Sequence, residues 1–321
     1  MRCLLSGAQR MDGNSSDFLG DFMFHGVINI YKEPGFTSHD VVAKLRGILR
    51  QKKIGHTGTL DPAAEGVLPV CLGKGTKLCD LLTDKRKTYQ AVLLLGTETD
   101  TQDMTGQVLE EHAVTVTEDA VRRAVGQFVG QIEQVPPMYS ALKVGGQKLC
   151  NLARKGIEVE RKPRPVTIYE IRIKNIALPL VTMEVHCSKG TYIRTLCQDI
   201  GQALGCGGCM ESLVRTQVAS FALADSLTLA QIEEAKKEDR LDQILLPIDQ
   251  VFSAYPKVYA SEEADKRLVN GNAIEQMQAR ADEAIDEGDP VRIYLSDGRF
   301  VGIYHLNEHQ FKLKKMFLET T

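Results

Sequence analysis

The chain has 321 residues, of which 43% are hydrophobic and 25% are charged, a composition typical of a folded protein with one large and one small domain. Its formal net charge of −3 argues against a protein that coats nucleic acid indiscriminately. No apolar run approaches the roughly 18 residues of a membrane-spanning helix, and the N-terminus lacks a signal-peptide core, so we expect a cytoplasmic protein.

Charge is segregated along the chain. Residues 44–90 hold ten Lys or Arg against four Asp or Glu, and residues 143–174 hold nine against three. Residues 98–119 hold seven acidic residues and no Lys or Arg, and residues 262–289 hold nine acidic residues against three basic ones. Solvated faces of opposite sign would produce this pattern, and so would a basic groove for a polyanion on an otherwise acidic body.

Eight cysteines are scattered in apolar stretches rather than set at the spacings of a disulfide framework, which suits a reducing compartment. Cys206 and Cys209 have the spacing of zinc ligands, but no second Cys-x-x-Cys or His pair accompanies them. We therefore expect buried free thiols and no bound metal.

The N-terminal part begins with a segment that has no hydrophobic period. Residues 1–22 contain Gly-Asn-Ser-Ser, and we expect them to form a disordered extension. A short apolar run at 26–31 is followed by a turn and by Thr37-Ser38, a helix start signal. The next segment predicts an amphipathic helix of about three turns. Its apolar face comprises Val41, Val42, Leu45, Ile48 and Leu49.

The segment from Gly55 to Gly66, GHTGTLDPAAEG, contains three glycines, a proline and two threonines. This composition excludes a regular helix or strand and favours turns with positive φ. Asp61 is therefore expected on a shaped loop. The residues alone leave two interpretations of Asp61 open: a helix N-cap with Pro62 at the first helical position, which propensity favours, or a functional carboxylate.

Hydrophobic patterns predict the regular elements of the middle of the chain. A basic, glycine-containing excursion with helix signals at 147–155 separates two groups of these elements. We expect strands at 67–72, 87–96, 166–173 and 180–187, and helices at 73–82, 117–129 and 191–204, the last capped by Thr191.

The C-terminal part starts with a predicted helix at 228–237 and a linker at 245–256. The last 65 residues contain a helix start at Ser261 and strand patterns at 291–295 and 300–304, joined by a Ser-Asp-Gly turn. These short elements predict a small β-rich domain.

Several blocks of the sequence resemble the bacterial tRNA pseudouridine-55 synthases, the TruB family of pseudouridine synthases. The family's catalytic loop has the pattern Gly-His-Thr-Gly-small-Leu-Asp-Pro, and residues 55–62 match every fixed position. The resemblance covers about residues 24–317. Further matching blocks are Lys87-x-Tyr89 before an apolar strand and a glycine, Ser-x-Gly-Thr-Tyr-Ile-Arg at 188–194, and Leu-x-Arg-Thr at 213–216.

The chain departs from the family pattern at two places. Family members commonly carry Lys-Pro-x-Gly-x-Thr-Ser where residues 32–38 are Lys-Glu-Pro-Gly-Phe-Thr-Ser, which moves the proline by one position. The family's later Gly-Phe pair is Ser220-Phe221 in this chain.

The resemblance implies an α+β fold. A pseudouridine synthase catalytic domain with a mixed, mainly antiparallel sheet would span residues 23–250, and a small PUA-like RNA-binding domain would span 251–321. An insertion at about 138–165 would grip the RNA stem-loop, although a surface helical hairpin would have the same sequence features. The cations expected to contact RNA are Lys143, Arg154, Lys155, Arg161 and Lys162.

The implied reaction isomerises uridine-55 in the T loop of tRNA. The bond from N1 to C1′ breaks, the base rotates, and C5 bonds to C1′, so that no electrons are lost and no cofactor or metal is required. The base must first be flipped out of its loop. The expected partner is the T stem-loop of tRNA, and we expect a monomer with no obligatory protein partner.

The resemblance assigns the chemistry to three residues. Asp61 acts as nucleophile or counter-charge, and whether it attacks C1′, attacks C6 or assists elimination to a glycal stays open. Arg194 is the cation that keeps this carboxylate ionised in a partly dry site. Tyr89 stacks on the target base and moves a proton. By themselves, an arginine early in a helix is more often on the surface and a tyrosine in a strand more often in the core.

Four further residues are assigned to the substrate site by the same resemblance. Tyr192 packs and hydrogen-bonds beside the carboxylate, and His56 contacts the flipped-out loop. Leu213 forms a hydrophobic wall, and Lys32 belongs to the support beneath the catalytic loop.

Two other classes of protein fit part of the pattern. An RNA-binding protein without activity is disfavoured because Asp61, Tyr89, Tyr192 and Arg194 are all present. A guided pseudouridine synthase, which acts inside an RNA–protein particle, tends to carry long basic extensions, and the basic excursion at 143–165 suits a stand-alone enzyme better.

Overall fold

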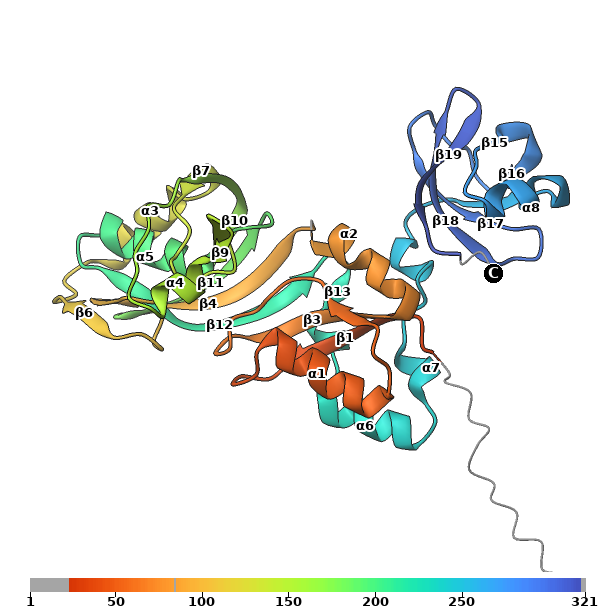
Figure 1. Cartoon of the computed structure of the whole chain (residues 1–321). Coiled ribbons are helices and arrows are strands. Elements are labelled where there is room, and N and C mark those ends of the chain that lie inside the picture. Colours follow the sequence, from red (N-terminus) through yellow and green to blue (C-terminus); the bar gives the residue numbers. More distant parts are fainter. Residues whose placement is uncertain (1–22, 84, 319–321) are drawn as a thin grey trace, which may run out of the picture.

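The computed structural model describes residues 23–83 and 85–318, so the extension predicted at 1–22 lies outside the described residues. Figure 1 shows two bodies: a long sheet flanked by helices, and a small β-rich body at the opposite end from β7 and α3. Across the described ranges, no helix is both long and apolar enough to cross a membrane.

Eight α-helices and four 3-10 turns occur in the described residues. The helices are α1 (Ser38–Leu49), α2 (Cys79–Thr83), α3 (Glu118–Gly126), α4 (Leu149–Ala153), α5 (Ile193–Ala203), α6 (Leu229–Lys237), α7 (Leu241–Ile244) and α8 (Glu262–Val269). The 3-10 turns are η1 (Gly73–Leu78), η2 (Leu223–Asp225), η3 (Gln250–Phe252) and η4 (Gln276–Gln278).

The strands fall into two large sheets and two small hairpins. The large sheet contains β1 (Gly26–Lys32), β2 (Ile54–His56), β3 (Glu65–Leu72), β4 (Lys87–Leu95), β7 (Gly130–Gln134), β10 (Arg164–Ala177), β11 (Leu180–Cys187), β12 (Gly208–Val218) and β13 (Phe221–Ala222). The hairpins are β5 (Thr97–Thr99) with β6 (Val108–Glu111), and β8 (Lys143–Val144) with β9 (Gln147–Lys148). The C-terminal sheet contains β14 (Lys257–Ala260), β15 (Ile274–Glu275), β16 (Ala279–Ala281), β17 (Pro290–Tyr294), β18 (Phe300–Asn307) and β19 (Gln310–Met316).

The large sheet has the order β1-β3-β12-β4-β11-β10-β7, with β2 on β3 and β13 on β12. Its pairs are antiparallel except β3 with β12, which run parallel. This parallel pair joins two halves of the sheet. The mixed, mainly antiparallel sheet confirms the predicted fold class.

Each half of the sheet has its own hydrophobic core. On one half, α3 and α5 pack against β4, β10, β11 and β12. On the other, α1 and α6 pack against β1 and β3. The second face of β1 and β3 is also covered, by residues of η1, α2, β12 and β13 together with Ile303 and Phe317 of the C-terminal body. This double burial explains the continuous apolar run at 67–72, which is typical of a strand buried on both faces.

The two halves meet at a close backbone approach. Gly66, the second residue of β3, pairs with Arg215 of β12. Its φ is +104°, and a Cβ on this residue would lie 2.3 Å from the carbonyl oxygen of Arg215. Only glycine fits here, and the glycine-rich segment 55–66 ends at this residue.

The C-terminal sheet has the order β15-β19-β18-β17-β14-β16 and curls into a barrel-like body around its own core (Figure 1). This confirms the predicted small β-rich, PUA-like domain. Ile303 and Phe317 belong to one hydrophobic cluster with Val67 and Leu78 of the large body. The predicted linker at 245–256 is packed rather than free, because Leu246 exchanges two backbone hydrogen bonds with Val27.

Several local predictions need correction. The predicted N-cap Thr191 is wrong: the N-cap of α5 is Tyr192, and the Thr191 hydroxyl donates to the Ser188 carbonyl at 3.0 Å. The segment 73–82 starts as the 3-10 turn η1 rather than as an α-helix. No strand was predicted at β7 or β12. Two register shifts in its pairing with β4 break the two-residue period of β12, which hides the strand from pattern analysis.

Seven cysteines lie in the described residues, and all are free thiols. Burial is confirmed for Cys71, Cys187, Cys197, Cys206 and Cys209.

Candidate active site

Asp61 lies on the loop between β2 and β3. No helix follows it, since residues 61–64 form a turn closed by a hydrogen bond from the Ala64 N–H to the Asp61 carbonyl at 3.1 Å. The interpretation of Asp61 as a helix N-cap is therefore wrong. The Asp61 side chain is 36% exposed, so the loop presents it at a surface that a substrate can reach.

The Lys32 ammonium lies beneath this loop and is fully buried. It donates to the carbonyl oxygens of Glu33 at 3.2 Å, Pro62 at 3.1 Å and Ala64 at 2.5 Å. Burial lowers the pKa of Lys32 to about 8, with the Asp61 charge opposing the shift. Lys32 thus occupies the supporting position that the resemblance implied, although the proline beside it has moved by one residue.

A second buried cation holds the other side of the loop. The Arg215 guanidinium donates to the carbonyl oxygens of Val67 at 2.7 Å, Gly58 at 3.3 Å and Thr59 at 3.5 Å. The start of α1 adds a clamp, because the Ser38 hydroxyl accepts from the N–H of Leu60 at 2.9 Å. The backbone that carries Asp61 is consequently fixed on several sides.

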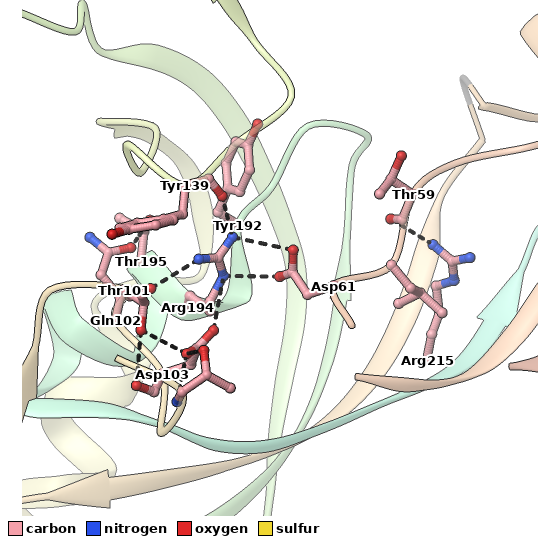
Figure 2. Close-up of polar contacts among 12 residues, drawn as sticks. Thr59, Asp61, Thr101, Gln102, Asp103, Tyr139, Tyr192, Arg194, Thr195 and Arg215 are labelled. Atoms are coloured by element: carbon pink, nitrogen blue, oxygen red, sulfur yellow. Dashed lines mark hydrogen bonds and ion pairs between the residues drawn. The ribbon is translucent and has the colours of Figure 1, made fainter. Parts of the chain in front are cut away.

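Arg194 forms the central ion pair of the site. Its Nε lies 2.9 Å from Asp61 Oδ2, and its Nη2 lies 3.4 Å from Asp61 Oδ1. Figure 2 shows the guanidinium between Asp61 on one side and Asp103 on the other, whose Oδ2 is 3.7 Å from Nε. Arg194 also donates to the carbonyl oxygens of Thr101 at 2.9 Å and Tyr139 at 2.8 Å. With the side chain only 4% exposed, these partners leave it one orientation.

The surroundings of Asp61 shift its acidity in opposing directions. Burial raises the pKa of Asp61 and is the largest influence. The charge of Arg194 and its hydrogen bond, together with the charge of Lys32, oppose this rise, whereas the charge of Asp103 adds to it. Removing water from a carboxylate disfavours its charged form, and a paired cation restores it.

Tyr89 and Leu213 lie in the hydrophobic core beside the loop that carries Asp61. Both are buried and belong to one hydrophobic cluster with Leu60 of that loop. Burial raises the pKa of Tyr89 to about 12, against the opposing charge of Arg215. Arg215 pairs with Tyr89 across β12 and β4. The Tyr89 phenol therefore keeps its proton at neutral pH.

Tyr192 and His56 flank the Asp61 region. Burial raises the pKa of Tyr192, and a hydrogen bond with Ser140 opposes the rise. His56 ends β2, and its Nδ1 accepts from the Gly58 N–H at 3.3 Å. Burial is the main cause that lowers the pKa of His56, and His39, whose ring lies edge-on at 5.4 Å, adds to it. The His56 ring is thus a neutral, half-buried surface near the loop.

The predicted RNA-contacting cations lie outside this cluster, on the insertion. Lys143, Arg154, Lys155 and Lys162 are exposed around the β8–β9 hairpin and α4. Arg161 differs from them, because its guanidinium donates to Glu158 at 2.9 Å and to the Pro136 carbonyl at 3.3 Å. Arg161 therefore holds the base of the insertion.

Four residues of the site escaped the analysis of the sequence. Asp103 belongs to the acidic segment 98–119, which we interpreted only as a charged face. The pattern Thr-x-Asp-x-Thr around Asp103 is the sequence feature that could have indicated a fixed carboxylate. Arg215 lay in a matched block but received no role. The Tyr139 carbonyl binds Arg194, and the Gln134 amide binds the backbone of Tyr192. Neither contact has a sequence signature. Among the residues with described placement, no group of three His, Cys, Asp or Glu side chains is set to hold a metal ion.

Comparisons with solved structures show to which class of protein this fold belongs. The chain resembles a chain of the Cbf5-Nop10-Gar1 complex with a TM-score of 0.70 and 29% identity, covering 92% of this chain and 86% of that one. It also resembles a chain of an H/ACA RNP bound to a substrate RNA containing 2′-deoxyuridine, with a TM-score of 0.69 and 27% identity over 92% and 86% of the two chains. Residues 46–193 match the family model of the TruB family pseudouridylate synthase N-terminal domain. The fold is that of a pseudouridine synthase, an isomerase.

Sequence relatives narrow the class to one family. A tRNA pseudouridine synthase B of Lachnoclostridium phytofermentans is 56% identical over 307 residues, which cover 92% of this chain and all of the relative. One of Clostridium kluyveri is 44% identical over 293 residues, covering 91% and 99%. Residues 194–253 match the model of the tRNA pseudouridylate synthase B C-terminal domain. The chain belongs to the TruB family of pseudouridylate synthases, which confirms the resemblance seen in its motifs.

Proposed function

We propose that this protein converts uridine-55 in the T loop of tRNA to pseudouridine, with Asp61 as the reacting carboxylate and without a cofactor. The observation that carries the proposal is the bidentate pair between Asp61 and the buried Arg194, on a loop that two further buried cations hold by its carbonyl oxygens. The relatives named tRNA pseudouridine synthase B support tRNA as the substrate.

Asp61 supplies the charge that the reaction needs. Attack at C1′, attack at C6 and assistance of elimination to a glycal all require an ionised carboxylate next to the ribose or the base. Arg194 favours that ionised form and directs the oxygens, while the rigid loop holds them in place. The partly exposed position of the carboxylate allows a substrate to approach.

Other residues of the chain are proposed to hold the flipped uridine base. The flipped uridine would stack on Tyr89 and pack against Leu213, with Tyr192 at the edge and His56 toward the vacated loop. Once the base has rotated and C5 has bonded to C1′, the proton on C5 leaves and N1 gains one, so that the product is an isomer of the substrate. In this proposal the Tyr89 phenol, which keeps its proton at neutral pH, takes part as a proton donor to N1 and not as the base that removes the proton from C5.

The proposed protein acts alone, as a cytoplasmic monomer. The high identity to the tRNA pseudouridine synthases B favours a stand-alone enzyme, although the solved neighbours come from assemblies. The free, buried thiols suit a reducing compartment.

We place the catalytic domain at residues 23–250 and the PUA-like domain at 251–321, although the C-terminal sheet itself begins only at Lys257.

A single assay tests the substrate and the catalytic residue together. Purified protein, without added guide RNA, is incubated with a T-arm stem-loop transcript, and pseudouridine is mapped by position. We expect product at position 55 and none in a transcript that carries cytidine there. Asp61→Asn should bind the transcript and fold normally but form no product. Product from this variant above background would refute the role of Asp61, and product only at other positions would refute the site.

A further inference from the structure

The last residue of β7, Gln134, makes an unusual pair of contacts with the start of α5. Its side-chain Nε2 donates to the carbonyl oxygen of Tyr192 at 2.9 Å, and its Oε1 accepts from the N–H of Tyr192 at 2.8 Å. Both hydrogen-bonding groups of the Tyr192 backbone are therefore held by one amide. Gln134 is only 2% exposed, so water does not compete for these bonds.

This contact fixes the backbone of the N-cap residue of α5. Tyr192 is the N-cap residue, and its own side chain makes no capping hydrogen bond. Its carbonyl also accepts the first helical bond, from the N–H of Leu196 at 3.1 Å. Fixing Tyr192 fixes the first turn of the helix, where Arg194 follows two residues later. The orientation of Arg194 toward Asp61 thus depends on a group that lies in another strand.

The segment after Gln134 contacts Arg194 directly. The Tyr139 carbonyl accepts from Arg194 Nη2 at 2.8 Å, and the Pro136 carbonyl accepts from Arg161 at 3.3 Å. Between these residues the chain enters the insertion proposed to grip RNA. One short segment therefore connects the insertion, the N-cap of α5 and the guanidinium of Arg194.

We propose that Gln134 is a positioning residue that sets Arg194 on Asp61 through the backbone of Tyr192. The inference rests on the proposed function, in which the Asp61–Arg194 pair carries the chemistry. A misplacement of about 1 Å of a reacting group costs on the order of 10²-fold in rate. Loss of the Gln134 bonds should therefore slow the chemical step without removing any group that contacts RNA.

The first test compares Gln134→Met, which keeps the volume and removes both bonds, with Gln131→Met at an exposed position of the same strand. At saturating T-arm stem-loop, we expect the single-turnover rate of Gln134→Met to fall about 10²-fold while its RNA affinity stays within about threefold of wild type. Gln131→Met should match the wild type in both. A wild-type rate for Gln134→Met would overturn the proposal.

The pH profile separates positioning from a merely structural role. The charged groups that act on Asp61 are Arg194 on α5, Asp103 after β5 and Lys32 at the end of β1. If Gln134→Met lets Arg194 move away, the carboxylate loses part of its cation and protonates more readily. The acid limb of the rate profile should then shift to higher pH. An unchanged limb together with a lowered melting temperature would show a structural role only and overturn the proposal.

A second variant keeps the test decisive if Gln134→Met folds poorly. Gln134→Glu can form both bonds only when its carboxyl is protonated, because the ionised form has no hydrogen to donate to the Tyr192 carbonyl. Its rate should rise as pH falls, before the acid limb of Asp61 sets in. A rate that does not depend on the introduced carboxyl would contradict the proposal. If the wild type forms no pseudouridine, the proposed function fails instead, and NMR titration of Asp61 in both variants still reports on the position of Arg194.

Discussion

The two roles proposed for Tyr89, stacking on the base and transfer of a proton, can be separated by a single substitution. Tyr89→Phe keeps the ring face, so stacking on a flipped base, worth about 1 to 3 kcal/mol, should survive. Only the hydroxyl is lost, and general acid–base groups contribute about 10²- to 10⁴-fold. We expect normal RNA affinity and a turnover lowered by that range, measured by single-turnover kinetics and RNA titration.

Tyr89→Leu serves as the comparison. It should add a binding defect to the lost turnover, because the ring face is gone. A core tyrosine without a chemical role would behave differently, with modest loss of stability in both variants and almost normal turnover for phenylalanine. That second pattern would refute the role of the hydroxyl.

The acidity of Asp61 gives a pH prediction with a definite sign. Because burial raises the pKa of Asp61 above the ordinary 3.8, the folded enzyme takes up this proton more readily than an exposed aspartate would. Activity should therefore be lost as pH falls through the raised pKa, at a higher pH than an exposed carboxylate predicts. The rate at saturating RNA, followed from neutral to acid pH, measures this acid limb of the pH–rate profile.

Asp103→Asn should move the same limb to lower pH. The Asp103 charge raises the pKa of Asp61, and removing it also leaves Arg194 paired with Asp61 alone. The rate at neutral pH should fall, because the Arg194 guanidinium loses its second anionic partner at 3.7 Å. Exposed Asp225, outside the site, provides a control whose substitution by Asn should leave the profile unchanged. A limb that moves upward in Asp103→Asn would contradict this account.

At the scale of elements, the insertion carries a group of exposed cations. Neutralising Lys143, Arg154, Lys155 and Lys162 by Gln should weaken RNA binding. Each lost phosphate contact should lower the slope of log affinity against log salt by about 0.7 to 0.9. Arg161 is left in place, since its contacts hold the base of the insertion. Titrations at several salt concentrations measure the slope.

Lys237 offers a matched control for that experiment. It is an exposed cation on α6, paired with Glu233 at 3.4 Å, and its substitution by Gln should leave the slope unchanged. If the fourfold variant also keeps the wild-type slope, the insertion is a solvated surface and does not grip RNA.

At the scale of the whole molecule, the C-terminal domain covers part of the catalytic domain. We also expect it to provide a second surface for binding tRNA. Removing the chain from about Ser253 should weaken the binding of full-length tRNA more than the single-turnover rate on a saturating stem-loop. It should also lower the melting temperature, because Val67, Leu78 and Phe221 lose the apolar cover that Ile303 and Phe317 provide. Loss of the rate at temperatures where the truncated protein is folded would place this domain in the active site.

The sequence by itself determined the parts of this protein that local chemistry decides. The amphipathic period of residues 38–49 predicted α1, the apolar runs predicted β3 and β4, and the composition of residues 55–66 predicted a shaped loop around Asp61. The blocks at 55–62, 87–89 and 188–194 indicated the family, and with it the pairing of Asp61 with Arg194. These features depend on neighbours in the chain or on a shared motif, so they can be seen without coordinates.

Only the tertiary structure decided which distant groups hold the site together. Asp103 approaches Arg194, Arg215 reaches the loop across the parallel pair of β3 and β12, and Gln134 holds the backbone at the start of α5 from another strand. Such contacts join residues separated by tens of positions, and two of them act on backbone atoms, which every residue shares. A carbonyl oxygen carries no sequence signature, and the long-range packing of the two half-sheets alone determines which side chain lies beside it.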